Sequence, residues 1–522
     1  MKQVIVIGAG HNGLVTAFYL ARAGFKPLVL ERRSVVGGAA ATEEIAPGYK
    51  CPALTHAISG LRPQILRDMG LKGRLRFLRP DARVTALSPD ARALVLWQDV
   101  ARTAESIRAW SAADAARYPE FCGAIQRMAG FLQPLLDSAP PSLTVAPAGD
   151  LWHLLQTGRR FRGLGRADGY RLLRWMPMAV ADLASEWFTT DLLQAVIAAP
   201  GIFGMAAGPW SAGTAAVLLL KAAVDPAPGG SSLTVEGGPG ALGAALARAA
   251  RDAGATIRCD TAVSRILVHD GQATGVVLSD GSEIPARAVV SNADPKRTLL
   301  GMVDPLELDP AVLHRMSHYR MSGAVGKMNV ALSALPEFHG VSAEELRGRL
   351  HIGPTIDYLE KAYDASKYGE LSPEPYLDIS IPSLLDSSLC APGRHVMSVH
   401  VQFAPYTLAR GASWGSLHDE FADTVIRTLE RYAPGIRGCI EHGHVLTPAD
   451  LEERYGLTGG HVYHGELALD QLFSMRPMFG WARYRTPIPR LFLCGAGTHP
   501  GGDISGASGR NAAMEIVKAL KE

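Results

Sequence analysis

The sequence predicts an α/β fold with a doubly wound, Rossmann-type domain. Three observations carry this prediction. A strand–glycine loop–helix–strand unit opens the chain, a helix–strand–hairpin unit lies in its middle, and a strand–glycine–helix unit closes it. Alternation of strand and helix patterns is typical of a parallel sheet covered by helices. With 522 residues, the chain is long enough for two or three domains.

The first unit has a clear order of elements. Gln3–Ile7 is a short apolar run rich in β-branched residues, which favours a strand. Residues 14–23 favour a helix that ends at Gly24, and residues 27–30 favour a second strand. This order is one βαβ half of a doubly wound sheet.

The middle and final units extend the same domain. Asp270-Gly271 joins two apolar runs and is a strong hairpin signal. The middle unit is expected to hold a helix and four strands, at 241–253, 256–259, 263–268, 273–278 and 288–290. The last unit is expected to hold a strand, a glycine-rich loop and a helix, at 491–494, 495–509 and 512–520.

Two long stretches separate these units and define a second domain. The nucleotide-binding domain is assigned to residues 1–79, 230–304 and 476–522. A substrate or cap domain, inserted twice, is assigned to residues 80–229 and 305–475.

The first glycine loop carries a dinucleotide fingerprint. Gly8, Gly10 and Gly13 follow a strand and open a helix, which is the context that the motif requires. Gly8 permits a tight turn, Gly10 lets the backbone approach a pyrophosphate, and Gly13 lets the helix pack on the strand. Glu31 ends the second strand, where its carboxylate can accept hydrogen bonds from ribose hydroxyls and would repel a 2′-phosphate. NADP is therefore disfavoured.

A second glycine pair favours FAD over NAD. Arg32-Arg33 is followed by Gly37-Gly38-Ala39-Ala40. Glycines directly after the acidic residue are expected where the chain passes close to the pyrophosphate and ribityl chain of FAD. Gly238, Gly240 and Gly243, with Asp260, also match the fingerprint, but we expect them to belong to the scaffold of the FAD domain, not to a second nucleotide site.

In combination, the motifs resemble the phytoene-desaturase superfamily of FAD-dependent oxidoreductases. The resemblance covers nearly the whole chain and is carried by the segments 30–40, 48–49, 61–64, 237–242, 291–295, 469–472 and 493–511. It implies a glutathione-reductase-like FAD-binding domain with an inserted substrate domain. It also implies that FAD is held by Gly8, Gly10, Asn12, Gly13, Glu31, Arg32, Arg33, Gly37, Gly38, Ala39, Val263, Asn292, Gly495, Gly502, Asp503 and Ile504.

Composition excludes several other classes. Lys and Arg number 52 against 50 Asp and Glu, and no basic block is present, so nucleic acid is not an expected partner. None of the six cysteines has the spacing of a redox pair, a zinc site or a disulfide framework. This pattern, with no signal peptide at the N-terminus, predicts a reducing, cytoplasmic location and no metal.

An uncharged run lies between Asp191 and Lys221. Prolines and glycines interrupt it, so we expect an apolar wall of a substrate chamber and not a membrane span. Peripheral contact of part of this run with a membrane surface is left open, as are a protein partner and the oligomeric state.

The predicted reaction is hydride exchange between the flavin and an apolar, lipid- or polyene-like substrate: desaturation, saturation or isomerisation. The alternatives are a flavin-bound regulatory protein with little turnover, and an amine or amino-acid oxidase on the same fold. His56, His461 and His464 are candidate acid–base residues, and Arg476 could orient substrate or pair with a carboxylate. No catalytic residue is assigned, because hydride transfer to flavin needs positioning more than a protein base.

Overall fold

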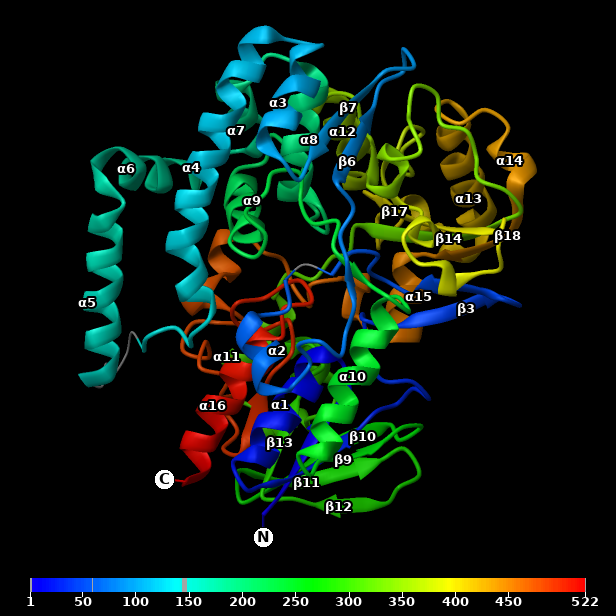
Figure 1. Ribbon diagram of the computed structural model, residues 1–522. Helices are drawn as coiled ribbons and strands as arrows, with labels where there is room; N and C mark the ends of the chain where they lie inside the picture. The colour runs from blue at the N-terminus through cyan, green and yellow to red at the C-terminus, as the bar shows by residue number, and fades with distance from the viewer. Residues whose placement is uncertain (1, 59, 143–147, 522) are drawn as a thin grey trace.

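The computed structural model describes residues 2–58, 60–142 and 148–521. Figure 1 shows two layers of the molecule, with both termini in the lower one. The lower layer is built around a five-stranded sheet whose order is β19-β13-β1-β2-β9. Its strands are all parallel: β1 (Gln3–Ile7), β2 (Lys26–Leu30), β9 (Thr256–Arg258), β13 (Ala288–Ser291) and β19 (Leu491–Leu493).

Both faces of this sheet are covered, which explains why β1 is an unbroken apolar run. Val4 and Val6 face a cluster formed with three helices, whereas Ile5 and Ile7 face a cluster formed with the β-hairpin and a further helix. The first face carries α1 (His11–Arg22), α10 (Pro239–Asp252) and α16 (Ala507–Lys521). The second carries β10 (Val263–His269), β11 (Gln272–Leu278), β12 (Glu283–Pro285) and α11 (Pro310–Ser317).

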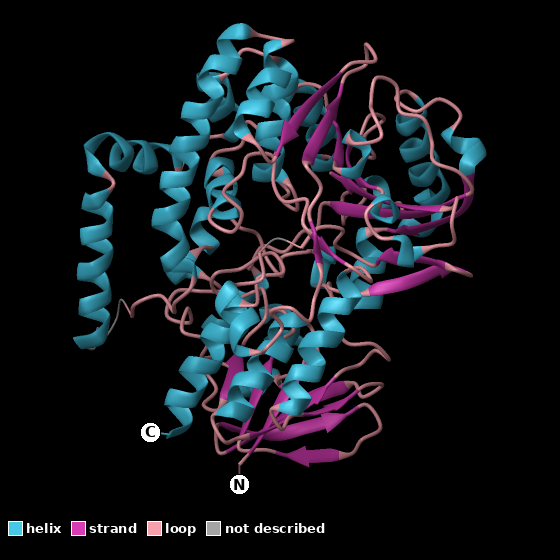
Figure 2. Ribbon diagram, in the orientation of Figure 1, coloured by secondary structure: helices cyan, strands magenta, loops and turns pink. Residues whose placement is uncertain are grey.

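The upper layer contains a mixed seven-stranded sheet, seen in magenta in Figure 2. Its order is β18 (Ile440–Leu446), β14 (Val325–Leu332), β17 (His395–Gln402), β16 (Tyr376–Ser380), β15 (Arg349–Ile352), β6 (Ala82–Leu87) and β7 (Ala93–Trp97). Strands β15 and β6 pair in parallel, and the other neighbours pair antiparallel. Every strand of this sheet comes from residues 80–229 or 305–475, and every strand of the parallel sheet comes from the other three stretches.

Helices complete the upper layer. One group packs on β6 and β7, and α13 (Trp414–Glu430) packs on β14, β16 and β17. The first group consists of α3 (Val100–Arg108), α4 (Ala112–Leu136), α7 (Val180–Trp187), α8 (Asp191–Ile202), α9 (Thr214–Ala222) and α12 (Ile356–Lys367). Two further helices, α5 (Ala148–Gly163) and α6 (Gly165–Trp175), project at the left edge of Figure 1.

Short elements link the two layers. They are α2 (Pro63–Asp68), α15 (Pro448–Tyr455), β3 (Thr42–Ala46), β4 (Tyr49–Pro52), β5 (Phe77–Leu78) and β8 (Thr234–Val235). The short helix α14 (Ile436–Cys439) lies beside α13 in the upper layer.

The uncharged run forms α8 and α9 and is mostly core. Leu218, Leu219 and Leu220 are buried against α4 and its neighbours, and Trp210 is the one large apolar side chain of the run that is exposed. Most apolar side chains of the run therefore hold the helices together, and only part of the run remains to wall a chamber. Contact of the run with a membrane surface stays a prediction. No helix in the described part of the chain is both long and apolar enough to cross a membrane.

Candidate functional site

A cavity of about 430 Å³ lies between the two layers. It begins at the carboxyl ends of β1 and β2 and reaches His400 on β17 of the upper sheet. Strand order reverses at β1, which lies between β13 and β2. Ligands of open α/β sheets bind at such switch points, so the cavity is placed where the fold predicts a cofactor.

The first glycine loop shapes one end of this cavity. Gly10 stands at the N-cap of α1 without a side-chain cap, so the first N–H groups of the helix are free for an anion. A Cβ atom placed on Gly38 would lie 3.0 Å from the Gly10 Cα atom. The two glycine loops therefore lie close together, and a side chain at position 38 would press against the backbone of Gly10.

Glu31 is fixed by the same loop. Its carboxylate accepts hydrogen bonds from the backbone N–H groups of Ala9, at 2.7 Å, and of Arg33, at 2.9 Å. Each oxygen keeps lone pairs for a ribose hydroxyl. The side chain is buried and lines the cavity, as its predicted role requires.

Unpartnered donors along the cavity fit the chemistry of FAD. Arg33 Nη1 and Arg297 Nε are buried without a hydrogen-bond partner, and both residues line the cavity near the glycine loops. His11 Nε2 and His464 Nδ1 are also buried without a partner, and both residues line the cavity. Buried polar groups are normally paired. A pyrophosphate can satisfy the guanidinium donors, and the polar edge of a flavin ring can satisfy the imidazole nitrogens.

Most of the predicted cofactor residues line the cavity. These are Gly8, Gly10, Asn12, Glu31, Arg32, Arg33, Gly38, Ala39, Val263, Asn292, Asp503 and Ile504. Three others allow close packing although they are not part of the cavity lining: Gly13, Gly37 and Gly495. Gly502 is also outside the lining, and its φ of +47° is a backbone conformation that favours glycine. A Cβ atom on Gly13 would lie 2.2 Å from the Gly8 carbonyl oxygen, and one on Gly495 would lie 2.6 Å from that of Asn292.

The second fingerprint, at Gly238, Gly240 and Gly243, is occupied by protein. A Cβ atom on Gly240 would lie 2.8 Å from the backbone nitrogen of Thr42, and one on Gly243 would lie 2.9 Å from the Gly37 Cα atom. These glycines let α10 pack on Gly37 of the second glycine pair and on the chain that follows it. This packing supports the interpretation of the motif as scaffold of the FAD domain.

A smaller chamber of about 110 Å³ opens from the far end of the cavity. Thr55, Phe203, His400, Tyr463 and Asp503 line both spaces. One wall is aliphatic and comes from β6 and α8: Val84, Val196, Ala199 and Pro200. A second part of the lining, the charged wall, includes Lys221, Asp225, Arg349 and Asp378. Part of the uncharged run thus does line a chamber, but the chamber is only half apolar.

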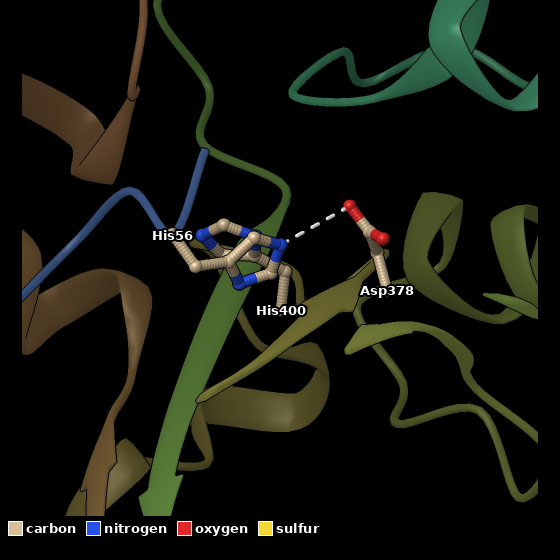
Figure 3. A group of neighbouring side chains, drawn as sticks. All are labelled: His56, Asp378 and His400. Atoms are coloured by element: carbon tan, nitrogen blue, oxygen red, sulfur yellow. Dashed lines mark ion pairs between the residues drawn. The ribbon is translucent and has the colours of Figure 1, made fainter. Parts of the chain in front are cut away.

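His56, His400 and Asp378 meet in the charged wall, as Figure 3 shows. The His56 and His400 rings stack with centroids 4.2 Å apart, and His56 Nε2 lies 3.5 Å from Asp378 Oδ2. Burial lowers the pKa of His56 to about 4, and burial followed by the charge of Lys327 lowers the pKa of His400 well below its usual value. Both imidazoles are therefore neutral at pH 7.

The potential ligand atoms of this cluster lie within 4.8 Å of one another, but its neighbours disfavour a metal cation. Arg349 Nη1 donates to both Asp378 oxygens, at 2.8 and 2.7 Å, and Lys327 Nζ lies 3.4 Å from His400 Nε2. Burial alone would raise the pKa of the Asp378 carboxyl, yet Arg349 and then His56 hold it well below its usual range. The positive charges of Arg349 and Lys327 are therefore already in contact with the cluster and would repel a metal cation.

The remaining candidates have structural roles. His461 is fully buried beside Tyr463 and lines neither space. Arg476 is also fully buried, and its guanidinium donates to the backbone carbonyls of five residues, Tyr463, Gly465, Glu466, Gln471 and Ala496. Both predicted roles for Arg476, orienting substrate and pairing with a carboxylate, are wrong. It fixes the loop that carries Tyr463 and His464.

The cysteines are not placed for redox chemistry. All six are free thiols. Cys51 packs in a hydrophobic cluster with the upper sheet, and Cys494 packs in a different cluster with the parallel sheet. Neither residue lines the cavity or the chamber. Burial raises the pKa of each thiol to about 12, so neither is a thiolate at neutral pH.

We therefore expect that replacing Cys51 and Cys494 together by serine leaves the rates of flavin reduction and reoxidation within a few-fold of the wild-type values. Stopped-flow absorbance of the FAD-bound double variant measures both rates. A loss of a hundredfold or more, with FAD still bound, would show that electrons pass through a thiol.

Several residues of the chamber were not found by sequence reasoning. Lys221, Asp378 and His400 carry no motif, and strands β16 and β17 bring two of them to the chamber from the inserted domain. One signal was available for Lys221, since it is the charge that closes the uncharged run. Arg297 follows the Ser291–Pro295 segment closely enough to have been included with it.

The nucleotide-binding sheet, the glycine loops, Glu31 and the cavity's unpartnered donors define an FAD-dependent oxidoreductase. Comparison with known proteins agrees. The chain belongs to the family described as flavin containing amine oxidoreductase, whose model matches residues 13–374. The cofactor of the protein is FAD.

Two relatives match nearly the whole chain, and a third matches about half of it. The chain is 37% identical to pyridine nucleotide-disulfide oxidoreductase domain-containing protein 2 of Rattus norvegicus, over 99% of this chain and 94% of that protein. It is 26% identical to the hydroxyneurosporene desaturase of Cereibacter sphaeroides, over 100% and 98%. It is 28% identical to the neurosporene-forming phytoene desaturase of Rhodobacter capsulatus, over 55% and 53%. The predicted superfamily is confirmed.

A solved structure shows the same fold. An oxidoreductase from Methanosarcina mazei superposes with a TM-score of 0.61 and 16% identity, over 99% of this chain and 100% of that one.

Proposed function

We propose that this oxidoreductase exchanges hydride between FAD and a substrate with an apolar carbon skeleton, held in the chamber that opens from the FAD cavity. We further propose that its FAD domain is of the glutathione-reductase type, which the parallel sheet with its three-stranded antiparallel β10–β12 layer supports. When bound, the flavin supplies a two-electron acceptor. The protein's own residues bind the substrate, orient it and keep water away.

The observation that carries the proposal is the shared boundary of the two spaces. Phe203, His400 and Tyr463 line both the cavity and the chamber, so a substrate in the chamber would lie against whatever occupies the end of the cavity. The aliphatic wall of Val196, Ala199 and Pro200 suits a hydrocarbon surface. A chamber of about 110 Å³ holds a small substrate or one end of a longer one.

Oxidation of an amine is the second candidate, because the family's description names that chemistry. The charges oppose it. Asp378 is already bound by Arg349, and Lys221 adds a further positive charge to the same wall. An ammonium substrate would meet like charge there.

Two measurements test the proposal. Anaerobic mixing of the FAD-bound protein with a panel of terpenes, polyenes, carboxylic acids and amines should bleach the flavin absorbance for members of a carbon-skeleton class and not for simple amines. Bleaching only by amines would support the second candidate. Bleaching by no member would favour a flavin-bound regulatory protein.

The chamber itself is tested by Ser231→Phe. Ser231 lines the chamber but not the FAD cavity, so a phenyl ring there should fill the chamber and leave FAD bound. We expect flavin reduction by the active substrate to fall about a hundredfold or more, equivalent to roughly 3 kcal/mol of lost transition-state stabilisation. An unchanged rate with a full complement of FAD would place the substrate elsewhere.

A further inference from the structure

We propose that Lys221 binds an anionic group of the substrate, a carboxylate, at the charged wall of the chamber. This inference rests on the proposed function, since it assigns the polar end of the same substrate. The aliphatic wall would then receive the carbon skeleton, and the charged wall would fix its orientation relative to the FAD cavity.

The ammonium group of Lys221 is incompletely satisfied. Lys221 is in the last turn of α9, and its Nζ atom lies 2.7 Å from Tyr463 Oη and 3.4 Å from the Phe203 carbonyl oxygen. The ammonium also lies over the rings of Phe203 and Tyr463, 4.9 and 5.0 Å from their centroids. An ammonium group has three N–H donors and two oxygens accept from this one, so one donor remains for a ligand. Lys221 makes no ion pair with any carboxylate in residues 2–58, 60–142 and 148–521. A charge inside a protein is costly unless it is paired.

The carboxylates of the chamber have their own partners. Asp378 accepts two hydrogen bonds from Arg349 Nη1, and Asp225 lies 3.7 Å from Arg83 Nη2. Arg349 Nε is itself buried without a hydrogen-bond partner. The chamber is lined by Lys221 and Arg349 against Asp225, Asp378 and Asp503, and Arg83 and Lys327 lie directly behind it. Because Asp225 pairs with Arg83 and Asp378 with Arg349, Lys221 is left without a carboxylate partner, and a carboxylate of the substrate would supply one.

The arrangement favours a carboxylate over other ligands. Lys221 reaches the chamber from α9 and Arg349 reaches it from β15. Ser231 and the Gly229-Gly230 turn line the same chamber. Charge-assisted hydrogen bonds from such donors are about twice as strong as neutral ones. Lys221 and Arg349 would repel a cationic ligand, and a neutral ligand would leave the Lys221 ammonium without a negative partner.

The ionisation of Lys221 gives the subsite a pH dependence. Burial lowers the pKa of Lys221 to about 8. The groups that face it from the surrounding elements are Tyr463, Asp503, Arg349, Asp378, Asp225, His56 and His400. Only the protonated ammonium attracts an anion, so the affinity should be constant below about pH 8 and fall above it, approaching tenfold per pH unit.

The test uses the FAD-bound protein and benzoate as the probe, with benzamide and benzylamine as its neutral and cationic counterparts. Binding is followed by the change in flavin absorbance and by calorimetry, in the wild type, Lys221→Met and Lys221→Arg. We expect benzoate to bind at least tenfold more tightly than benzamide, and benzylamine not to bind. Lys221→Met should weaken benzoate about ten- to a hundredfold, whereas Lys221→Arg should keep most of the affinity.

The experiments distinguish a failure of the Lys221 subsite from a failure of the proposed function. Equal binding of benzoate and benzamide, or benzoate binding that Lys221→Met leaves unchanged, overturns the subsite. Should Lys221→Met fail to fold or to hold FAD, the wild-type pH profile decides, because an affinity that stays flat to pH 10 also overturns it. If benzoate binding depends on Lys221 while no carbon substrate ever bleaches the flavin, the subsite stands and the proposed function fails.

Discussion

Gly10→Val should yield a protein that folds but is purified without FAD. Gly10 opens α1 and lines the cavity, where the side chain of Asn292 leaves too little space for a Cβ atom. A valine there would project toward the path of the pyrophosphate and deny it the free N–H groups of the helix. We expect the dissociation constant for FAD to rise at least about a hundredfold, or roughly 3 kcal/mol, as measured by flavin fluorescence titration of the apoprotein.

The substitution needs two controls, because a Cβ atom on Gly10 would also lie 2.7 Å from Asn292 Nδ2. In the double variant Gly10→Val/Asn292→Ala this contact is removed, and FAD should still be lost. Gly130→Val changes an exposed glycine of α4 that has open space around it, and FAD should be retained. A full yellow spectrum in purified Gly10→Val would show that this loop does not hold the cofactor.

Arg476→Met should cause a large loss of stability. The guanidinium is completely buried and binds five backbone carbonyls. Methionine fills a similar space but leaves these acceptors without a donor. A buried acceptor left without a donor costs about 1–3 kcal/mol. Because several carbonyls lose their donor, we expect the free energy of unfolding to fall by about 3–5 kcal/mol, measured by denaturant titration of the FAD-bound protein.

Arg320→Met is the matched control. Arg320 binds Glu466 and Asp470, close to the same loop, but almost half of its side chain is exposed. Exposed ion pairs contribute at most about 1 kcal/mol. Arg476→Lys should not restore stability, because an ammonium cannot reproduce the planar fork of donors. A loss below about 1 kcal/mol in Arg476→Met would contradict the role assigned to this residue.

The sequence was most informative where one local segment determines the structure. The first βαβ unit and the Asp270-Gly271 hairpin occur as predicted, with β1 at Gln3–Ile7 and β10 paired with β11. Their apolar runs and turn residues specify strand and turn without help from distant parts of the chain. The first part of the FAD site belongs to the same class, because Gly8, Gly10, Gly13, Glu31, Gly37 and Gly38 lie within one continuous segment.

The substrate end could not be predicted, because it is assembled from distant segments. Lys221, Arg349 and Asp378 come from three separate elements, and no spacing in the sequence announces that they meet. The uncharged run shows a related limit, because the sequence alone does not say which part of it lines the chamber. A run of apolar residues looks the same whether it lines a chamber or forms the core between helices, and here tertiary packing buries most of it.

The role of Arg476 could not be predicted either, because its partners are brought together only by the fold. A lone arginine before a proline suggests a surface or ligand role on composition alone, because arginine is rarely buried. Its carbonyl partners extend from Tyr463 to Ala496, and only the folded loop brings them around one guanidinium.

The crystal structure of the FAD-bound protein is the most direct test of the claim that the chamber is where hydride exchange occurs. We predict adenine near Glu31 and Val263, and the flavin ring at the junction lined by Phe203, His400 and Tyr463, with one side open to the chamber. A flavin ring at the opposite end of the cavity, or one separated from the chamber by protein side chains, would contradict this claim.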